Sequence, residues 1–407
     1  MISIEHGLEI VMSVAAKQTR PDWTIAEAVP LPEASSRVLR ETILSDADSP
    51  PFDKAIRDGF AVRSEDLRNV PKALRVIGES RAGLGADVTV GPGECCEIMT
   101  GAPLPAGADA VVMVEHSDRP DANSVNIHRS PRSNEGLLRQ GAEAHKGDHL
   151  LEPGRKLRLA DIGVLASTGK STVMVSKRPR VAIVATGDEL VEVADQPASG
   201  QIRNSNSYTL LVQCAMAGAD PVLIGIARDN LDDLREKIGR GLESDILLVS
   251  GGVSMGKYDL VENVFAEFGV EVFFDKIAMK PGKPTVFGFR SSVPGTFVFG
   301  LPGNPVSTIV AFHMFVRPVI LSLLKASDTK PALFEATLEA PAKCDPERAA
   351  LVPASVRFEA GGYRISTAPW KGSSDLVGLS RANALIVIPR RDGTLQAGES
   401  AQFLLME

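Results

Sequence analysis

Strand-like and helix-like segments alternate between residues 178 and 325, and this alternation limits the fold more than any other feature of the sequence. Short apolar runs, such as "RVAIVAT" and "DILLVS", are separated by longer amphipathic runs, such as "LDDLREKIGRGL" and "DLVENVFAEFG". Strands that are apolar throughout and separated by helices are typical of a mostly parallel sheet covered on both faces. The sequence therefore predicts a central three-layer α/β/α domain over residues 178–326 of a multidomain α/β protein.

The sequence on either side of this domain has a different pattern. Residues 1–46 read as mainly helical, and we expect them to join residues 141–177, with a short helix ending at Gly169, in one elongated N-terminal domain. Residues 47–140 alternate short β-rich runs with Gly/Pro turns, which predicts an inserted β-domain. Residues 327–407 again read as strands and turns, which predicts a C-terminal β-barrel or, alternatively, a sandwich.

The composition argues against several classes of partner. The chain has 407 residues and a net charge of −7, which disfavours nucleic acid or an anionic membrane as the main partner. The four cysteines lack C-x-x-C spacing and are expected to be reduced, as in a cytoplasmic protein. The N-terminus has no basic leader, and we found no run of 18 apolar residues, so we expect neither a signal peptide nor a membrane span.

Small, glycine-rich and charged residues follow the predicted strands of the α/β domain. In an open α/β sheet, ligands bind beyond the carboxyl ends of the strands. We therefore expect these residues to form one ligand site. They are Asp188, Glu189, Arg228, Asp229, Gly251, Gly252, Ser254, Asp259, Lys276, Lys280, Lys283, Pro302, Gly303 and Pro305.

The residue types at this edge favour a phosphorylated or oxyanion ligand. Three lysines fall within eight positions on a turn stiffened by Pro281 and Pro284, and glycine loops before helices present backbone N–H groups to anions. Glu189, Asp229 and Asp259 suit a Mg²⁺ ion that holds phosphates. The six histidines show no metal-ligand spacing, and no nucleophilic triad is evident.

A purely structural interpretation of the same residues is also open. Asp259 can cap a helix, with Glu262 three residues later completing a capping box. Asn304 can cap the next helix, with Pro305 at its first position. The acids can also be solvated surface groups.

Six segments in order resemble one protein family, the molybdopterin molybdenumtransferases of the MoeA type, which are related to the E domain of gephyrin. The resemblance covers nearly the whole chain. The segments are "PPFDKAIRDGFAVR" (50–63), "IMTGAPLPAGADAVVMVE" (98–115), "TGDEL" (186–190), "SGGVSMGKYD" (250–259), "KIAMKPGKP" (276–284) and "GLPGNPVS" (300–307).

The resemblance implies an activity and its partners. It implies a cytoplasmic, elongated homodimer with a MogA-like central domain. Its reaction would transfer molybdenum from molybdate to adenylyl-molybdopterin, release AMP and require Mg²⁺. An upstream adenylyltransferase and apo-molybdoenzymes are the implied further partners.

The resemblance also assigns roles to residues. Glu189, Asp259, Lys276, Lys280, Asp58 and Thr100 would be catalytic, with Glu189 and Asp259 at the metal and Asp58 and Thr100 reaching into the partner subunit's site. The substrate-binding residues would be Asp229, Gly251, Gly252, Ser254, Lys283, Pro302, Gly303, Pro305, Glu143, Arg348 and Ser373.

Three departures from the family pattern are evident, and the first of them also adds charge at Lys54 and Arg57. The chain has "FDKAIRDGFA" where the family commonly has "FDNSAMDGYA", so Phe60 replaces a tyrosine. Glu143 stands where aspartate is usual, and Pro353 stands where a second arginine is expected after Arg348.

Two other functions remain open at this point. The central domain alone would also suit adenylylation of molybdopterin by ATP. A scaffold that kept the fold and lost catalysis is the alternative from another functional class.

Overall fold

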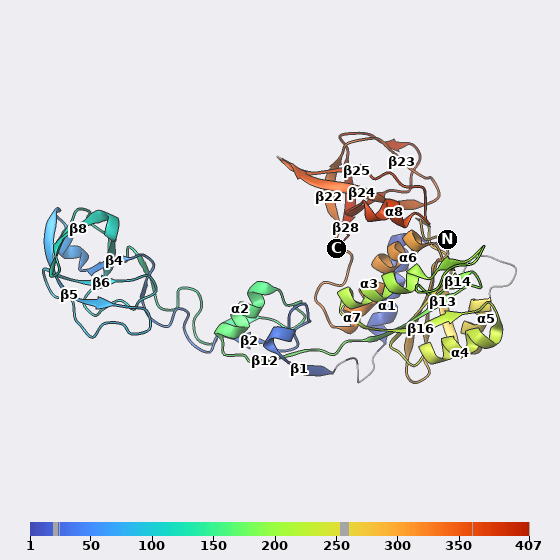
Figure 1. Ribbon diagram of the computed structural model, residues 1–407, viewed down its shortest axis with the longest axis horizontal. Helices are drawn as coiled ribbons and strands as arrows, with labels where there is room; N and C mark the ends of the chain where they lie inside the picture. Colours follow the sequence, from blue (N-terminus) through green and yellow to red (C-terminus); the bar gives the residue numbers. More distant parts are fainter. Residues whose placement is uncertain (19–22, 24, 253–259, 360, 407) are drawn as a thin grey trace.

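The molecule is elongated, with a β-domain at one end, a small domain in the middle, and the α/β domain with a barrel at the other end (Figure 1). This computed structural model describes residues 1–18, 23, 25–252, 260–359 and 361–406. The predicted sites Ser254 and Asp259 lie outside the described residues.

The α/β domain is built on a six-stranded sheet in which three neighbouring pairs are parallel and two are antiparallel. Apolar runs form its strands, as predicted. In order across the sheet they are β16 (Asp220–Ala227), β13 (Arg180–Thr186), β17 (Ile246–Ser250), β21 (Thr296–Leu301), β20 (Val286–Arg290) and β18 (Val270–Phe274).

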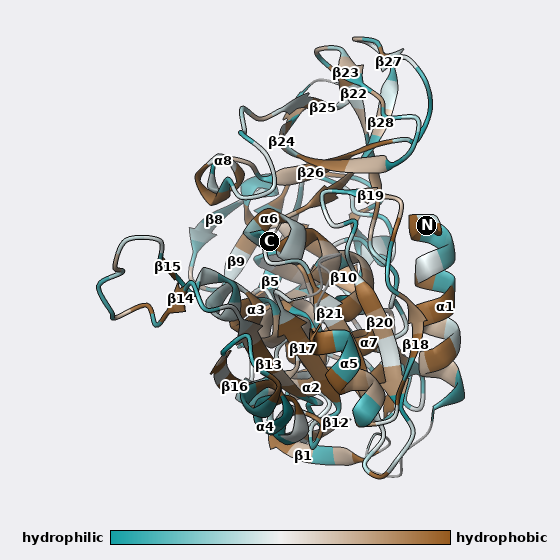
Figure 2. Cartoon of the chain, turned by 90° about the vertical axis from the view of Figure 1, so that its right-hand side faces the viewer, coloured by the Kyte–Doolittle hydropathy of each residue, from teal (hydrophilic) through white to brown (hydrophobic). Residues whose placement is uncertain are grey.

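Helices cover both faces of this sheet (Figure 2). Alternate residues of each strand point to opposite faces, so Ile183 and Leu248 enter one core and Val184 and Leu247 the other. The first face is covered by α1, α3, α6, the π turn η5 and α7, and the second by α4 and α5. The helices are α1 (Ile4–Lys17), α3 (Ser205–Ala217), α4 (Leu231–Gly241), α5 (Leu260–Glu267), α6 (Pro305–Ala311), η5 (Phe312–Val316) and α7 (Arg317–Leu323).

The position of α1 corrects the sequence-based prediction. We expected the N-terminal helix to pack with residues 141–177, but it packs on η5 and α7 of the α/β domain. Gly7 allows a close approach, because a Cβ there would lie 3.2 Å from Phe315 Cε1 of η5 and 2.7 Å from Ile277 Cδ1. The apolar face of α1, which includes Val11 and Val14, belongs to the same buried core as the residues of η5 and α7.

The small middle domain is also less helical than predicted. Residues 26–46, which we expected to be mainly helical, form two short strands and one 3₁₀ turn. Its core joins Leu39 and Ile43 to Leu165 and Val175 from the later segment. Its elements are β1 (Ala26–Pro30), η2 (Leu31–Glu33), β2 (Ile43–Leu44), β11 (His149–Leu151), α2 (Leu159–Ser167) and β12 (Thr172–Ser176).

The β-domain is a six-stranded sheet with strand order β7-β4-β6-β5-β9-β8. Its two apolar cores are centred on Phe60 and on Ile98. Its elements are β3 (Lys54–Ala55), β4 (Gly59–Val62), η3 (Ser64–Leu67), β5 (Lys72–Ser80), β6 (Glu94–Ile98), β7 (Ala110–Met113), η4 (Val114–His116), β8 (Ser117–Asp121), β9 (Ser124–Ile127) and β10 (Leu137–Leu138).

Two chain segments connect the β-domain to the rest of the molecule, and they are bonded to each other. Ser49 N–H donates to the Ala144 carbonyl at 2.7 Å, and Glu143 N–H donates to the Ser49 carbonyl at 2.8 Å. Further along, Gln140 N–H donates to the Asp53 carboxylate at 2.8 Å. The entering and leaving segments therefore form one double-stranded connection.

The C-terminal domain is a closed barrel and not a sandwich. Its strands pair in the order β24-β25-β22-β28-β26, and an additional β24–β26 pairing closes the ring. The strands are β22 (Phe334–Leu338), β24 (Ala349–Glu359), β25 (Gly362–Thr367), β26 (Ala384–Ile388) and β28 (Ser400–Leu405), accompanied by β23 (Ala342–Lys343), β27 (Thr394–Leu395) and α8 (Leu376–Ser380).

One strand pairing crosses from the α/β domain to the barrel. The two-residue strand β19 (Met279–Lys280), from the lysine turn, pairs in parallel with the start of β24. In Figure 2, β19 lies between the barrel and the sheet of the α/β domain. The lysine turn is thereby attached to both domains.

The helix Pro305–Leu323 differs from the sequence-based expectation about membranes. By length and composition alone its 19 residues could cross a membrane, although we had found no such run. However, 78% of its apolar window is buried inside the molecule. It is thus placed as the core helix of the α/β domain.

Candidate functional site

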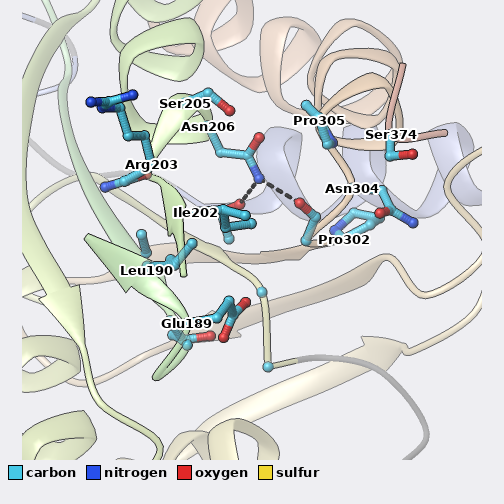
Figure 3. Close-up of a pocket in the computed structure, with 18 of the residues that line it drawn as sticks. Glu189, Leu190, Ile202, Arg203, Ser205, Asn206, Pro302, Asn304, Pro305 and Ser374 are labelled. Carbon is cyan, nitrogen blue, oxygen red and sulfur yellow. Dashed lines mark hydrogen bonds between the residues drawn. The ribbon is translucent and has the colours of Figure 1, made fainter. Parts of the chain in front are cut away.

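A cavity of about 680 Å³ opens beyond the carboxyl ends of β13, β17 and β21 (Figure 3). This is the edge at which the sequence placed the ligand site. The lining includes the predicted Glu189, Asp229, Gly251, Gly252, Pro302, Gly303 and Pro305, together with Thr186, Asn204, Asn206, Pro284 and Ser374.

The glycine loop after β17 is shaped by the neighbouring strand. Gly251 and Gly252 have φ values of 96° and 67°, a region that side chains rarely occupy. A Cβ on Gly251 would lie 2.6 Å from the Thr186 carbonyl, and one on Gly252 would lie 2.7 Å from Thr186 Oγ1. Only glycine lets these two strand ends approach each other so closely at the cavity.

Asn206 joins two walls of the cavity and was not predicted from the sequence. Its Nδ2 donates to Ser250 Oγ at 2.9 Å and to the Gly303 carbonyl at 2.8 Å, as the dashed lines in Figure 3 show. Thr186 Oγ1 and Asn206 Oδ1 are buried and have no hydrogen-bond partner within the described part of the chain. Both atoms can accept hydrogen bonds from a ligand.

Three carboxylates follow β13 and β16. Asp229 N–H donates to Asp188 Oδ1 at 3.2 Å, and Arg228 Nη1 donates to the Asp188 carbonyl at 3.2 Å. Partial burial, followed by repulsion from Asp188 and Glu189, raises the pKa of Asp229 above its usual value. A cation beside these acids would relieve that repulsion.

The acids fit a Mg²⁺ ion only with help from a ligand. Within the ranges the structure describes, no three His, Cys, Asp or Glu side chains form a group that could hold a metal. Mg²⁺ is commonly bound by one or two carboxylates plus phosphate oxygens and water. Glu189 and Asp229 at the cavity fit that pattern, whereas Asp259 lies outside the described residues.

The three lysines do not line the cavity as we expected. Pro284, the residue after Lys283, lines the cavity, but the lysines are not in its described lining. Lys276 Nζ lies 2.9 Å from Asp275 Oδ2, and this hydrogen bond raises the pKa of Lys276. Lys280 is half exposed and faces the barrel, and Lys283 is exposed.

The barrel supplies one further edge of the site. Val306 N–H donates to the Ser373 carbonyl at 3.0 Å, and Ser374 lines the cavity. Asn304 precedes α6 but makes no side-chain cap bond, and its Nδ2 donates to Ser373 Oγ at 2.9 Å. The structural interpretation thus holds for Pro305 at the first helical position, while the Asn304 side chain joins the barrel.

Asp58, Thr100 and Glu143 do not reach this cavity within one chain. Asp58 directly precedes β4 in the β-domain, at the opposite end of the molecule (Figure 1). Its Oδ1 accepts hydrogen bonds from Thr100 N at 2.7 Å and Thr100 Oγ1 at 2.8 Å, which holds the pKa of Asp58 below its usual value. Glu143 lies in the double-stranded connection, where it accepts a hydrogen bond from Ser49 Oγ.

The fold and the cavity define a class: multidomain α/β proteins with a ligand cleft beyond the carboxyl ends of a mostly parallel sheet. Three family models cover almost the whole chain. They are the MoeA N-terminal region (domain I and II) over residues 2–169, a probable molybdopterin binding domain over 182–322, and the MoeA C-terminal region (domain IV) over 335–406. The chain belongs to the MoeA family.

Curated relatives and solved structures agree with this assignment. The chain is 35% identical to the molybdopterin molybdenumtransferase of Nostoc sp., over 99% of this chain and 94% of the relative. It is 33% identical to that of Bacillus subtilis, over 96% and 91%. A molybdopterin biosynthesis moeA protein from Pyrococcus horikoshii OT3 matches with a TM-score of 0.82 and 28% identity, covering 100% of both chains.

Proposed function

We propose that this protein transfers molybdenum from molybdate to adenylyl-molybdopterin, releasing AMP, with Mg²⁺ as the required ion. Family membership supports the general part of this statement: the chain is a transferase of molybdenum cofactor biosynthesis. The single observation that carries the specific part is the cavity, where acids, glycine loops and the end of the lysine turn meet.

Each wall of the cavity has a role in this proposal. Thr186 Oγ1 and Asn206 Oδ1 accept hydrogen bonds from the pterin, which is rich in N–H donors. At the Gly251–Gly252 loop and at the start of α6, the backbone can lie close to the substrate phosphates. The lysine turn supplies positive charge for molybdate, which is a dianion and a substrate of the reaction.

Mg²⁺ would be held by Glu189 and Asp229, and by Asp259 as the sequence predicts. When bound, the ion neutralises the substrate's phosphate charge. The raised pKa of Asp229 supports this assignment, because a site with clustered carboxylates favours a cation. Glu189, which follows the neighbouring parallel strand β13 at the same edge of the sheet, orients the phosphate side of the substrate.

A second copy of the chain completes the site in this proposal. Asp58 and Thr100 form a fixed, exposed pair that lies far from the cavity of their own chain (Figure 1). A homodimer would let one protomer present this pair to the cleft of the other. The four cysteines are free and buried, which supports a cytoplasmic location, where an adenylyltransferase would supply the substrate and apo-molybdoenzymes would receive the product.

The test is mass spectrometry of the pterin after purified protein is incubated with adenylyl-molybdopterin, molybdate and Mg²⁺. We expect a molybdenum-bearing pterin and stoichiometric free AMP, both of which disappear when molybdate or Mg²⁺ is omitted. Formation of adenylyl-molybdopterin from ATP with release of pyrophosphate would assign the adenylyltransferase activity instead. No reaction with any of these substrates would favour the scaffold.

A further inference from the structure

Asp345 lies where the barrel meets the lysine turn, and its two carboxylate oxygens have different partners. Oδ1 accepts hydrogen bonds from the backbone N–H groups of Glu347 at 2.9 Å and Arg348 at 3.2 Å, which closes a turn. Oδ2 lies 3.8 Å from Lys280 Nζ and 3.5 Å from Arg348 Nη2. One oxygen thus fixes the carboxylate, and the other is shared by two cations.

The backbones that carry these two cations are also fixed. Strand β19 pairs with β24 so that Lys280 is opposite Ala350, and Ala349 N–H donates to the Ala278 carbonyl at 3.0 Å. Arg390 Nε donates a hydrogen bond to the Pro346 carbonyl at 3.0 Å, which further fixes the turn that carries Arg348. What remains free to move is the side chain of Lys280, which is 53% exposed.

Without a shared anion, two neighbouring cations repel each other, and a long exposed lysine moves away at little cost. Asp345 prevents this, and backbone donors followed by Arg348 and Lys280 keep the pKa of Asp345 below its usual value, so the group stays ionised. Arg348 Nε is buried and has no hydrogen-bond partner among the described residues. The guanidinium therefore keeps a donor for another acceptor.

We propose that Asp345 is a positioning residue that holds Lys280 and Arg348 together as a preformed cation pair for the incoming oxyanion. This inference rests on the proposed function, in which Lys280 meets molybdate. It gives the barrel a part in molybdate capture, through a carboxylate that does not itself touch the substrate. Neither the α/β domain nor the barrel forms this pair alone, because Lys280 belongs to one and Arg348 to the other.

Two substitutions separate this role from a simple turn-forming role. Asp345→Asn keeps the acceptor for the two backbone N–H groups and removes the charge between the cations. Asp345→Glu keeps the charge and moves the carboxylate out of the turn by one methylene. Asp392→Asn, at an exposed loop position on the same barrel, is the matched control for loss of one negative charge.

The measurements are the KM for sodium molybdate and kcat, the Kd for molybdate by calorimetry without pterin, and the Tm. We expect Asp345→Asn to raise the KM and the Kd about 3- to 10-fold, the range of one or two exposed ion pairs, with kcat within about twofold. Asp345→Glu should recover part of that loss, and Asp392→Asn should behave as the parent protein.

Three results would overturn the inference. The first is an unchanged molybdate KM and Kd in Asp345→Asn. The second is the reverse order, with Asp345→Glu more impaired than Asp345→Asn, which would assign a turn-forming role. The third is a fall in kcat and Tm without a change in KM. Absence of molybdate binding and turnover in the parent protein would instead overturn the proposed function, and this inference with it.

Discussion

The cleft of the α/β domain and the Asp58–Thr100 pair of the β-domain are built in opposite ways. The cleft gathers residues from many strand ends and leaves Thr186 Oγ1 and Asn206 Oδ1 without partners in the described part of the molecule. In the β-domain, Asp58 Oδ1 accepts two hydrogen bonds from Thr100. The difference teaches that the cleft keeps buried acceptors available for a ligand, whereas the carboxylate oxygen Asp58 Oδ1 already has its partners within the β-domain.

The largest effect is expected at the lysine turn, where Lys280 lies beside Asp345 of the barrel and outside the described lining of the cleft. Lys280→Ala should lower molybdate-dependent product formation on the order of 100-fold, because the proposed function assigns its charge to the molybdate oxyanion. The Tm should stay nearly unchanged, since the removed ammonium is half exposed and leaves no cavity. The measurement is AMP release with a molybdate titration.

Lys343→Ala, at an exposed position on β23, is the control for that substitution and should retain full activity. Normal turnover in Lys280→Ala would remove the lysine turn from the mechanism.

The second effect tests whether the two regions meet across a dimer. Asp58→Ala and Lys280→Ala should each be inactive alone, but co-expressed copies should recover about one quarter of the parent activity. Random pairing makes about half of the dimers mixed, and each mixed dimer has one intact site. AMP release by the co-expressed mixture provides the measurement, and tandem purification of differently tagged copies, which isolates the mixed dimers, should raise the activity to about one half. Mixed dimers without activity would mean that each cleft uses the β-domain of its own chain.

The third effect compares one hydrogen-bonding asparagine in each region. Asn206→Ala removes two hydrogen bonds that join cavity walls and should lower kcat/KM roughly 5- to 10-fold and stability by about 1 to 2 kcal/mol. Asn126→Ala in the β-domain removes one exposed bond to Asp118 and should leave kcat/KM unchanged. Steady-state kinetics and urea unfolding measure both. Equal activity in the two variants would mean that Asn206 does not organise the cleft.

The smallest effect is a pair of opposite changes in Tm. The pKa of Asp229 is raised in the folded state, so its ionisation costs stability as the pH rises above the usual value of 3.8. Asp229→Asn should therefore raise the Tm by about 1 °C at neutral pH, and the gain should disappear as the pH falls. The Asp58 pKa is lowered, so Asp58→Asn should lower the Tm at neutral pH, and this loss should fade below pH 3.8.

Calorimetry from about pH 2.5 to 7.5 follows both variants. A change in Tm of the same sign for both substitutions would contradict the contrast between Asp229, whose pKa is raised, and Asp58, whose pKa is lowered by its hydrogen bonds to Thr100.

The sequence predicted those parts of the molecule in which local pattern and packing agree. Strands of the α/β sheet, the glycine loop and helix α3 ending at Gly218 follow directly from periodicity and turn residues. The helix α1 was assigned to the wrong neighbour, because periodicity shows an apolar face but not its complement. Asn206 was missed because its role comes from two oxygens distant in sequence, on Ser250 and Gly303.

The sequence predicted several residues of the candidate site correctly, but it wrongly placed the lysines in the same cavity as the acids and glycines. Glu189, Asp229, Gly251 and Gly252 do line a common cavity. Lys280 turns toward Asp345, because the pairing of β19 with β24 draws the lysine turn to the barrel. No local sequence pattern shows a pairing between a two-residue strand and a strand about 70 residues later.

The double-stranded connection between residues 45–53 and 140–148 has a mechanical consequence. Because the two segments are hydrogen-bonded to each other along their length, they bend together, and the connection cannot become longer unless both segments do. The length of this connection therefore fixes the distance between the β-domain and the rest of the molecule. Adding residues to one segment only would break hydrogen bonds between the two segments and change the orientation of the β-domain. Adding the same number of residues to both would move the β-domain outward and keep its orientation.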